Sequence, residues 1–192
     1  MTRLVQIAAE VQRFLDARSW PNCVIGGIAV QRWGEPRLTE DVDLTLLTGF
    51  GHEEAYVDAL LARYQARVES PRDFALAHRV VLLRTADGVG IDIALGGLPF
   101  ECNTVARASD FEFASGERIR TCSAEDLLTM KAFAGRDQDW LDVKGVLIRQ
   151  GDRLNWKLIL SELRPLCELK PAPETLARLE QLREQVEGKT TK

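Results

Sequence analysis

The chain has 192 residues, of which 28% are charged, and its formal net charge at pH 7 is −4. This balance argues against a broadly basic nucleic-acid-binding protein, although a local basic patch beside a site is compatible with it. The length is sufficient for one hydrophobic core, or for one domain with a helical appendage. No apolar run approaches membrane-spanning length and the N-terminal segment lacks a signal-peptide pattern, so we expect a soluble, cytoplasmic protein with no membrane partner.

The cysteines give no sign of a metal site or of a disulfide framework. The four of them are scattered along the chain, with no C-x-x-C spacing and no cluster of histidines nearby: Cys23, Cys102, Cys122 and Cys167. Such isolated cysteines are typical of reduced thiols in a cytosolic protein. We therefore expect four free thiols.

The first 120 residues alternate between helical and extended patterns. Apolar residues at helical spacing predict a helix over about 2–18, which the Trp20-Pro21-Asn22 sequence ends. Beyond it we expect strands at 23–25, 39–47, 78–85 and 90–95, helices at 27–33 and 53–64, and a hairpin turn at Asp87-Gly88. Short extended segments near 111–114 and around Ile119 complete the expected sheet.

From Ser123 onward the pattern is helical. Ser123 is suited to cap a helix that carries acids in its first turn, and further helices are expected over about 137–149, 156–167 and 171–186. The sequence therefore predicts an α/β (α+β) fold with a small mixed, twisted sheet flanked by helices. We expect a core over residues 1–120 and a C-terminal helical region packed on it over 121–192.

An Asp-Val-Asp sequence lies inside one of the expected strands. Because side chains alternate between the two faces of a strand, Asp41 and Asp43 point to one side and Val42 to the other. Two neighbouring carboxylates repel each other, and a divalent cation with oxygen ligands is the usual compensation. The alternative is that the pair is an ordinary strand-end or loop feature.

Two adjacent glycines, Gly26 and Gly27, lie where the strand at 23–25 turns into the following helix. Since they carry no Cβ, a phosphate can approach the free backbone N–H groups at the start of that helix. Taken alone, a Gly-Gly pair at the end of a strand is most often just a turn.

The order Gly26-Gly27, short helix, loop and Asp41-Val42-Asp43 resembles the nucleotidyltransferase superfamily with the DNA polymerase beta-like fold. The chain is most similar to small bacterial AbiEii-type toxin nucleotidyltransferases of type IV toxin–antitoxin systems and their relatives. The resemblance implies transfer of a nucleoside monophosphate from an NTP such as ATP to a hydroxyl, with release of pyrophosphate. It also implies two Mg²⁺ ions (or Mn²⁺), an RNA, protein or small-molecule acceptor, and a possible cognate antitoxin.

Asp92 is the candidate for the third carboxylate of that superfamily. On its own strand it lies between Ile91 and Ile93, which is compatible with a solvated sheet face as well as with a site. The resemblance implies that Asp92 joins Asp41 and Asp43 as a metal ligand and assists the attacking hydroxyl as ligand or base. We expect all three carboxylates to converge beside the glycine pair.

Arg37 and Thr39 precede the Asp pair and have two interpretations each. Arg37 is either a contact for the phosphate tail of the nucleotide or a solvated loop cation. Thr39 either orients the loop or is simply a β-forming residue that begins the strand.

A second stretch also resembles the family: Ser123 to Leu127, then Lys131, Arg136, Asp139 and Asp142. The resemblance implies that Lys131 reaches the nucleotide phosphates and that Asp139 or Asp142 helps to complete the cleft. The alternative is a surface helix pair with these side chains solvated and with Asp142 paired to Arg136. The spacing leaves open which of Asp137, Asp139 and Asp142 matters.

A rival hypothesis is a nucleotide-binding or partner-binding module that keeps the fold but has no turnover. The retention of three mutually repelling carboxylates speaks against it, because a module that only binds has no need of them. The sequence encodes no contact that selects the NTP or the acceptor.

Overall fold

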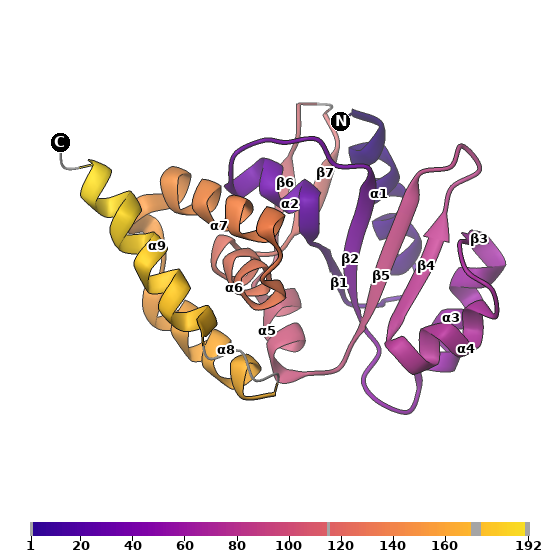
Figure 1. The fold of residues 1–192 in the computed structure, drawn as a ribbon. Helices are drawn as coiled ribbons and strands as arrows, with labels where there is room; N and C mark the ends of the chain where they lie inside the picture. Colours follow the sequence, from indigo (N-terminus) through magenta and orange to yellow (C-terminus); the bar gives the residue numbers. More distant parts are fainter. Residues whose placement is uncertain (1, 115, 170–173, 191–192) are drawn as a thin grey trace. The chain divides into compact units, whose positions relative to one another are not determined.

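The computed structural model describes residues 2–114, 116–169 and 174–190 of the chain. These residues form nine α-helices, one short 3-10 helix and one seven-stranded mixed sheet with the strand order β3-β4-β5-β2-β1-β7-β6 (Figure 1). The expected mixed α/β fold is confirmed.

The chain divides into two compact units. One comprises Met1–Ile28 and Leu38–Cys122, and the other comprises Ala29–Arg37 and Ser123–Lys192. Compared with the expected division into 1–120 and 121–192, residues 29–37 group with the C-terminal helices. The contacts explain this grouping, because Arg149 Nη1 donates to the carbonyl oxygen of Gly34 at 2.5 Å and Gln150 Nε2 donates to that of Trp33 at 2.6 Å.

Most of the N-terminal elements are those that the sequence predicts. The order is α1 (Thr2–Asp16), β1 (Asn22–Val24), α2 (Gly26–Trp33), β2 (Asp41–Leu47), α3 (Glu53–Arg63), β3 (Gln65–Ala66), α4 (Pro71–His78), β4 (Val80–Arg84), β5 (Gly90–Gly96), α5 (Pro99–Arg107), β6 (Ser109–Glu112) and β7 (Arg118–Thr121). Helix α2 begins in the first unit and continues into the second. Strand β6 begins and ends two residues before the segment expected at 111–114, which it overlaps.

Helices α4 and α5 and strand β3 were not expected. Both helices are short and have a proline in the first turn, and α4 is enclosed by Ser70 and Arg79, whose φ angles are 46° and 54°. Consequently His78, expected at the start of a strand, is the last residue of α4. An eight- or nine-residue helix spans too few turns for its apolar period to stand out.

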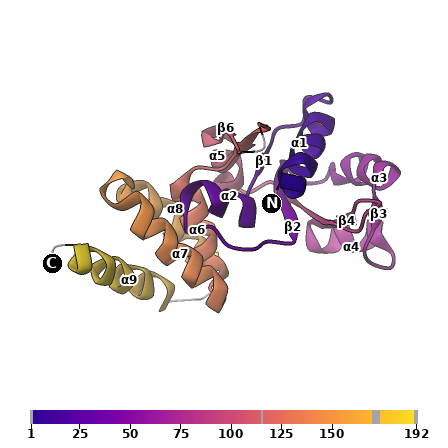
Figure 2. The same cartoon turned by 90° about the horizontal axis from the view of Figure 1, so that it is seen from above.

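Strand β2 lies at the centre of the sheet, parallel to β5 and antiparallel to β1. Strands β4 and β5 form the expected antiparallel hairpin, and Gly88 in its turn has a φ of 89°. In Figure 2, helices α3 and α4 lie beside β3 and β4 at one end of the sheet.

One face of the central strands belongs to the hydrophobic core. The inward side chains of β2 and β5 are fully buried and pack with apolar residues of α3 and α4: Val42, Leu44, Leu46, Ile91, Ile93, Leu95, Val57, Leu60 and Ala75. Each such side chain contributes about 1.5–3 kcal/mol when buried. A slip by one residue would turn all of them outward, so this face sets the register of both strands.

The second unit is helical, as expected. It contains α6 (Ala124–Ala134), α7 (Asp137–Gln150), the 3-10 turn Gly151–Arg153, α8 (Trp156–Leu169) and α9 (Glu174–Thr190). Ser123 caps α6 as predicted, because its Oγ accepts the backbone N–H of Asp126 at 3.1 Å. For the helix expected at 171–186, residues 171–173 lie outside the described residues.

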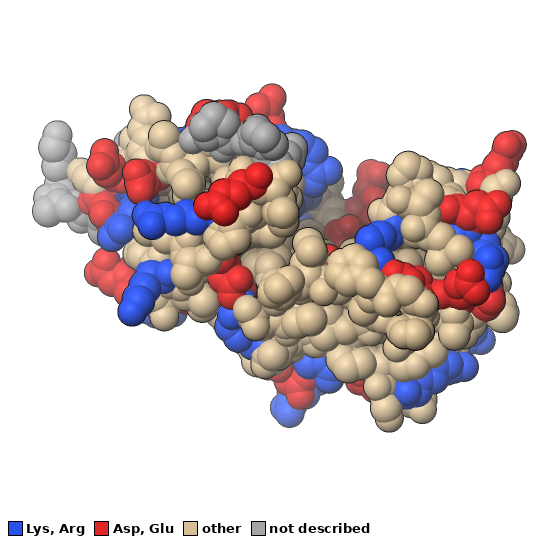
Figure 3. Space-filling view, turned by 90° about the horizontal axis from the view of Figure 1, so that it is seen from below, with Lys and Arg blue, Asp and Glu red and all other residues tan. Residues whose placement is uncertain are grey.

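All four cysteines are free. Within the described ranges, no helix combines the length and the apolar character needed to span a membrane. On the face drawn in Figure 3, basic and acidic side chains are interspersed rather than gathered into a broad basic field.

Candidate active site

Three carboxylates lie on the face of the sheet that points away from the hydrophobic core. Strands β2 and β5 pair in parallel with Asp43 opposite Asp92 and Asp41 opposite Gly90. Residues opposite each other on neighbouring strands point to the same side, and so do residues two apart on one strand. Asp41, Asp43 and Asp92 therefore share one face, which we call the acid face.

Two glycines make room for these carboxylates. A Cβ built on Gly26 would lie 2.0 Å from Oδ2 of Asp43, and one built on Gly90 would lie 2.0 Å from Oδ1 of Asp41. Gly26 also has a φ of 60°, a conformation that residues with a side chain rarely adopt. Any residue with a Cβ at either position would displace the carboxylate that faces it.

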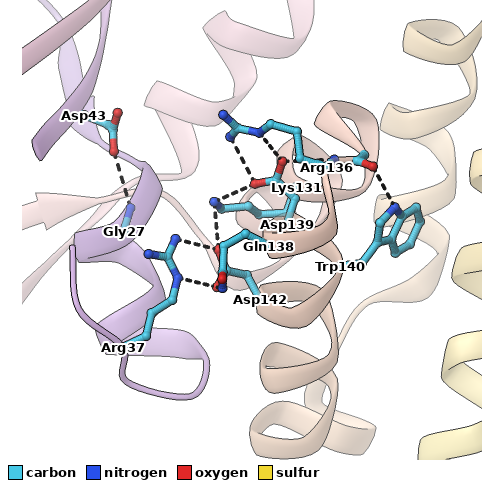
Figure 4. Close-up of polar contacts among 10 residues, drawn as sticks. Gly27, Arg37, Asp43, Lys131, Arg136, Gln138, Asp139, Trp140 and Asp142 are labelled. Atoms are coloured by element: carbon cyan, nitrogen blue, oxygen red, sulfur yellow. Dashed lines mark hydrogen bonds and ion pairs between the residues drawn. The ribbon is translucent and has the colours of Figure 1, made fainter. Parts of the chain in front are cut away.

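The start of α2 lies against the acid face. The backbone N–H of Gly27 donates to Oδ2 of Asp43 at 3.4 Å (Figure 4). A Cβ on Gly27 would lie 2.3 Å from Oγ1 of Thr39, so the loop before β2 packs directly on the first turn of the helix. This position favours an anion, because the first N–H groups of a helix carry partial positive charge.

Arg67 also belongs to this group of residues, although no pattern in the sequence indicates it. Its guanidinium forms an ion pair with Asp92 through Nη2, and its Nη1 lies 4.0 Å from Oδ1 of Asp41. The backbone N–H of Arg67 donates to the carbonyl oxygen of Leu82 at 3.0 Å, which extends the pairing of the two-residue strand β3 with β4. No motif surrounds Arg67, so only the strand pairing reveals it.

The acid face suits a divalent cation by its chemistry, because hard cations such as Mg²⁺ prefer carboxylate oxygens. Its three carboxylates stand on adjacent, rigid strands in matching register. As the described side chains stand, however, no three Asp, Glu, His or Cys groups are close enough to enclose an ion. In this arrangement the guanidinium of Arg67 takes the place beside Asp92.

A second group of charged residues lies in the C-terminal unit, and we call it the charged cluster: Arg37, Lys131, Arg136, Asp139 and Asp142. Lys131 Nζ lies 2.9 Å from Asp139 Oδ1 and 2.8 Å from Asp142 Oδ2 (Figure 4). Arg136 Nε donates to Asp139 at 2.6 Å, and Arg37 binds Asp142 through Nε at 2.7 Å and Nη2 at 2.9 Å.

These contacts overturn several of the alternative interpretations. Lys131, Asp139 and Asp142 are buried, so the hypothesis of a solvated surface helix pair is wrong. Arg136 pairs with Asp139 rather than Asp142, and Arg37 is not a solvated loop cation.

The three aspartates of this stretch therefore differ in position. Asp139 and Asp142 are buried within the charged cluster, whereas Asp137 is exposed in the first turn of α7. The acid face belongs to the first unit and the charged cluster to the second. The roles toward a nucleotide that the resemblance implies for Lys131, Asp139 and Asp142 stay predictions.

The surroundings of the two buried aspartates favour their charged forms. Burial alone would raise the pKa of Asp139, but hydrogen bonds from Arg136 and Lys131 outweigh it and hold the pKa below its ordinary value. For Asp142, burial is likewise outweighed by hydrogen bonds from Arg37 and Lys131, and its pKa is also lowered. Both carboxylates are thus ionised over the physiological range of pH.

A family model described as the nucleotidyl transferase AbiEii toxin of type IV toxin–antitoxin systems matches residues 23–185. The match covers well over half of the chain and includes the glycine pair, the acid face and the charged cluster. The chain belongs to the AbiEii nucleotidyltransferase family. As the family resemblance implied, this protein is a nucleotidyltransferase.

A similar fold is found in a solved structure at low sequence identity. An antigenic nucleotidyltransferase-like protein from Paracoccidioides brasiliensis is 18% identical over 92% of each chain, with a TM-score of 0.54. The lincosamide antibiotic adenylyltransferase LnuA bound to lincomycin is 15% identical, with a TM-score of 0.49 over 71% of this chain and 92% of that chain. The comparison with curated proteins gave no match.

Proposed function

We propose that this AbiEii-family protein transfers a nucleoside monophosphate from an NTP to a hydroxyl group with the help of a divalent cation. The observation that carries the proposal is the register of β2 and β5, which puts Asp41, Asp43 and Asp92 on one face. The start of α2 at Gly26 and Gly27 lies against the same face, and it supplies a place for the phosphates of the nucleotide.

The carboxylates Asp41, Asp43 and Asp92 would hold the cation, Mg²⁺ or Mn²⁺. When bound, such ions offset the negative charge that develops on the phosphate oxygens and lower the pKa of a hydroxyl that binds to them. The glycines that face Asp41 and Asp43 leave room for their carboxylates. Two ions suit a set of three carboxylates that spans two strands.

The reaction then has a simple balance of atoms. The acceptor's hydroxyl oxygen forms a bond to the α-phosphorus while the bond from that phosphorus to the oxygen bridging to the β-phosphate breaks. In this proposal Asp92 accepts the proton of the hydroxyl, and pyrophosphate leaves with the electron pair of the broken bond. The backbone N–H groups at the start of α2 orient the phosphates during the exchange.

The family's description also supports a toxin of a toxin–antitoxin pair. In this role the protein would modify a cytoplasmic acceptor, whether an RNA, a protein or a small molecule, and a cognate antitoxin would restrain it. ATP is one candidate among the NTPs. Incubation of each NTP, labelled at its α-phosphate, with total RNA or cell lysate would identify both the nucleotide and the acceptor, because this label is transferred with the nucleoside monophosphate.

The proposal is tested by removing one carboxylate. Asp43→Ala should lower Mg²⁺-dependent release of pyrophosphate by roughly a thousandfold or more, because one ligand of the proposed site is lost. Its melting temperature should be unchanged or slightly raised, since repulsion on the acid face is relieved. The matched control is Asp110→Ala, which removes an exposed aspartate of the edge strand β6 and should leave turnover intact.

Turnover by Asp43→Ala at the rate of the parent would refute the assignment of the acid face. Calorimetry with each NTP, in the presence and absence of Mg²⁺, distinguishes an enzyme from a module that binds the nucleotide without turnover. Binding of an NTP to the parent protein without any release of pyrophosphate, with acceptor present, would favour a non-catalytic nucleotide-binding module.

A further inference from the structure

A row of residues crosses three strands on the acid face and ends at an arginine just beyond a fourth. Asp43 of β2 lies opposite Asp92 of β5, and Asp92 lies opposite Leu82 of β4. Leu82 in turn accepts the backbone N–H of Arg67, just after β3. The pairing of the strands thus delivers a cation to the same side of the sheet as the three carboxylates.

Arg67 is the counter-ion of the acid face in this arrangement. Its guanidinium contacts Asp92 and lies 4.0 Å from Asp41, while all three side chains are only partly exposed, at 29%, 30% and 46% respectively. Attraction to one cation offsets the mutual repulsion of the carboxylates. The protein can therefore keep the acid face assembled when no metal ion is bound.

The same contact opposes the binding of a metal ion to Asp92. Mg²⁺ binds carboxylate oxygens at about 2.0–2.1 Å and holds them in near-octahedral geometry. The guanidinium of Arg67 holds one oxygen of that carboxylate, Oδ1, and its positive charge repels an ion at the other oxygen. Full engagement of Asp92 by a cation therefore requires Arg67 to move away from it.

We propose that Arg67 is an exchange residue, which binds Asp92 in the metal-free protein and a phosphate of the nucleotide once a divalent cation takes its place. This inference rests on the proposed function of the acid face. The guanidinium suits both partners, because its planar fork binds carboxylate and phosphate oxygens equally well in a bidentate manner. Arg67 is a positioning residue for the carboxylates before the exchange and a substrate contact after it.

The exchange predicts two effects of opposite sign in one variant. Arg67→Met keeps most of the aliphatic stem but removes the guanidinium. We expect Mn²⁺ to bind this variant roughly fivefold more tightly than the parent in the absence of nucleotide, since no partly exposed ion pair has to be broken. In the presence of saturating Mg²⁺, α,β-methylene ATP should bind roughly tenfold more weakly, because a charge-assisted hydrogen bond to phosphate is lost.

Calorimetry and the electron paramagnetic resonance signal of Mn²⁺ measure these affinities without any turnover. The matched control is Arg72→Met, which removes an arginine of the same unit that pairs with Glu54 and Asp58 at the surface. Both affinities of the control should remain within about twofold of the parent, because exposed charges at a distance are screened by salt. A merely structural role of Arg67 would weaken the binding of both ligands together.

The outcomes separate this inference from the proposed function. If the parent binds Mn²⁺ and Arg67→Met binds it equally or more weakly, the exchange is wrong although the metal site stands. If the parent binds no divalent cation at all, the exchange and the metal dependence both fail. Should Arg67→Met not fold, Arg67→Gln replaces it, because glutamine keeps a polar side chain but carries no charge; unchanged binding of nucleotide by that variant would contradict the phosphate contact.

Discussion

Gly90 shows how a single residue without a side chain can decide whether a carboxylate is usable. It lies opposite Asp41 on the neighbouring strand, where even a methyl group would overlap the carboxylate and approach Nη1 of Arg67 to 3.2 Å. Asp41 is half exposed, so it can turn away from an added methyl at little cost to the fold. A methyl group added at residue 90 should therefore displace the carboxylate of Asp41 while lowering the stability of the protein only slightly.

We accordingly expect Gly90→Ala to lower the metal-dependent release of pyrophosphate at least about tenfold, since small displacements of a catalytic group are costly. Unfolding by urea should show a loss of only about 1 kcal/mol, within the range of ordinary substitutions. Gly188→Ala in α9, where an added Cβ meets open space, is the control and should change neither quantity adversely. Full activity of Gly90→Ala would mean that Asp41 tolerates displacement and is no essential ligand.

At the scale of elements, the charged cluster connects α6 and α7. Lys131 on α6 lies between Asp139 and Asp142 on α7, and the side chain of Lys131 is only 10% exposed. Each of the two carboxylates also keeps an arginine, Arg136 or Arg37. Loss of the lysine therefore leaves neither carboxylate without a cation, which limits the cost.

Lys131→Met should lower the free energy of unfolding by about 2 kcal/mol, because two charge-assisted hydrogen bonds of a buried group are lost while both carboxylates keep a partner. Equilibrium denaturation in urea measures this loss. Lys144→Met, which changes an exposed lysine of α7, is the matched control and should stay within about 0.5 kcal/mol of the parent. Equal stability of the two variants would show that the cluster does not hold α6 to α7.

At the scale of the whole molecule, the same two aspartates make stability depend on pH. In the folded protein the pKa of Asp139 and that of Asp142 lie below the ordinary value of 3.8. On unfolding, both carboxyls regain that value, so below about pH 5 the unfolded chain binds more protons than the folded one. Stability that is complete near neutral pH is therefore lost progressively as the pH falls toward the folded pKa values.

Urea unfolding at a series of pH values between 7 and 3 measures this effect, which can reach about 1.4 kcal/mol per pH unit for each carboxyl. The double variant Asp139→Asn/Asp142→Asn should be less stable than the parent at pH 7 but should lose less stability on acidification. Asp137→Asn/Asp152→Asn changes two exposed aspartates and serves as the charge-matched control. A double variant with the acid sensitivity of the parent would place the relevant carboxyls elsewhere.

Local patterns in the sequence were sufficient for the long elements and for part of the site. The alternation in Asp41-Val42-Asp43 correctly indicated that both carboxylates share a face, and Ser123 correctly indicated the start of α6. Helices α4 and α5 were missed because each is too short to display its period, and Arg67 was missed because no pattern surrounds it.

By itself, the sequence determined the fold class, the order of the long elements, the family and the pairing of a glycine corner with two carboxylates. Only the tertiary structure decided that Asp92 lies opposite Asp43, that Arg67 reaches this face, and that Lys131 lies between two aspartates. The physical reason is the separation along the chain of the residues that interact. Periodicity records which side of its own element a residue faces, whereas register between strands and ion pairs between helices depend on packing among segments far apart in the chain.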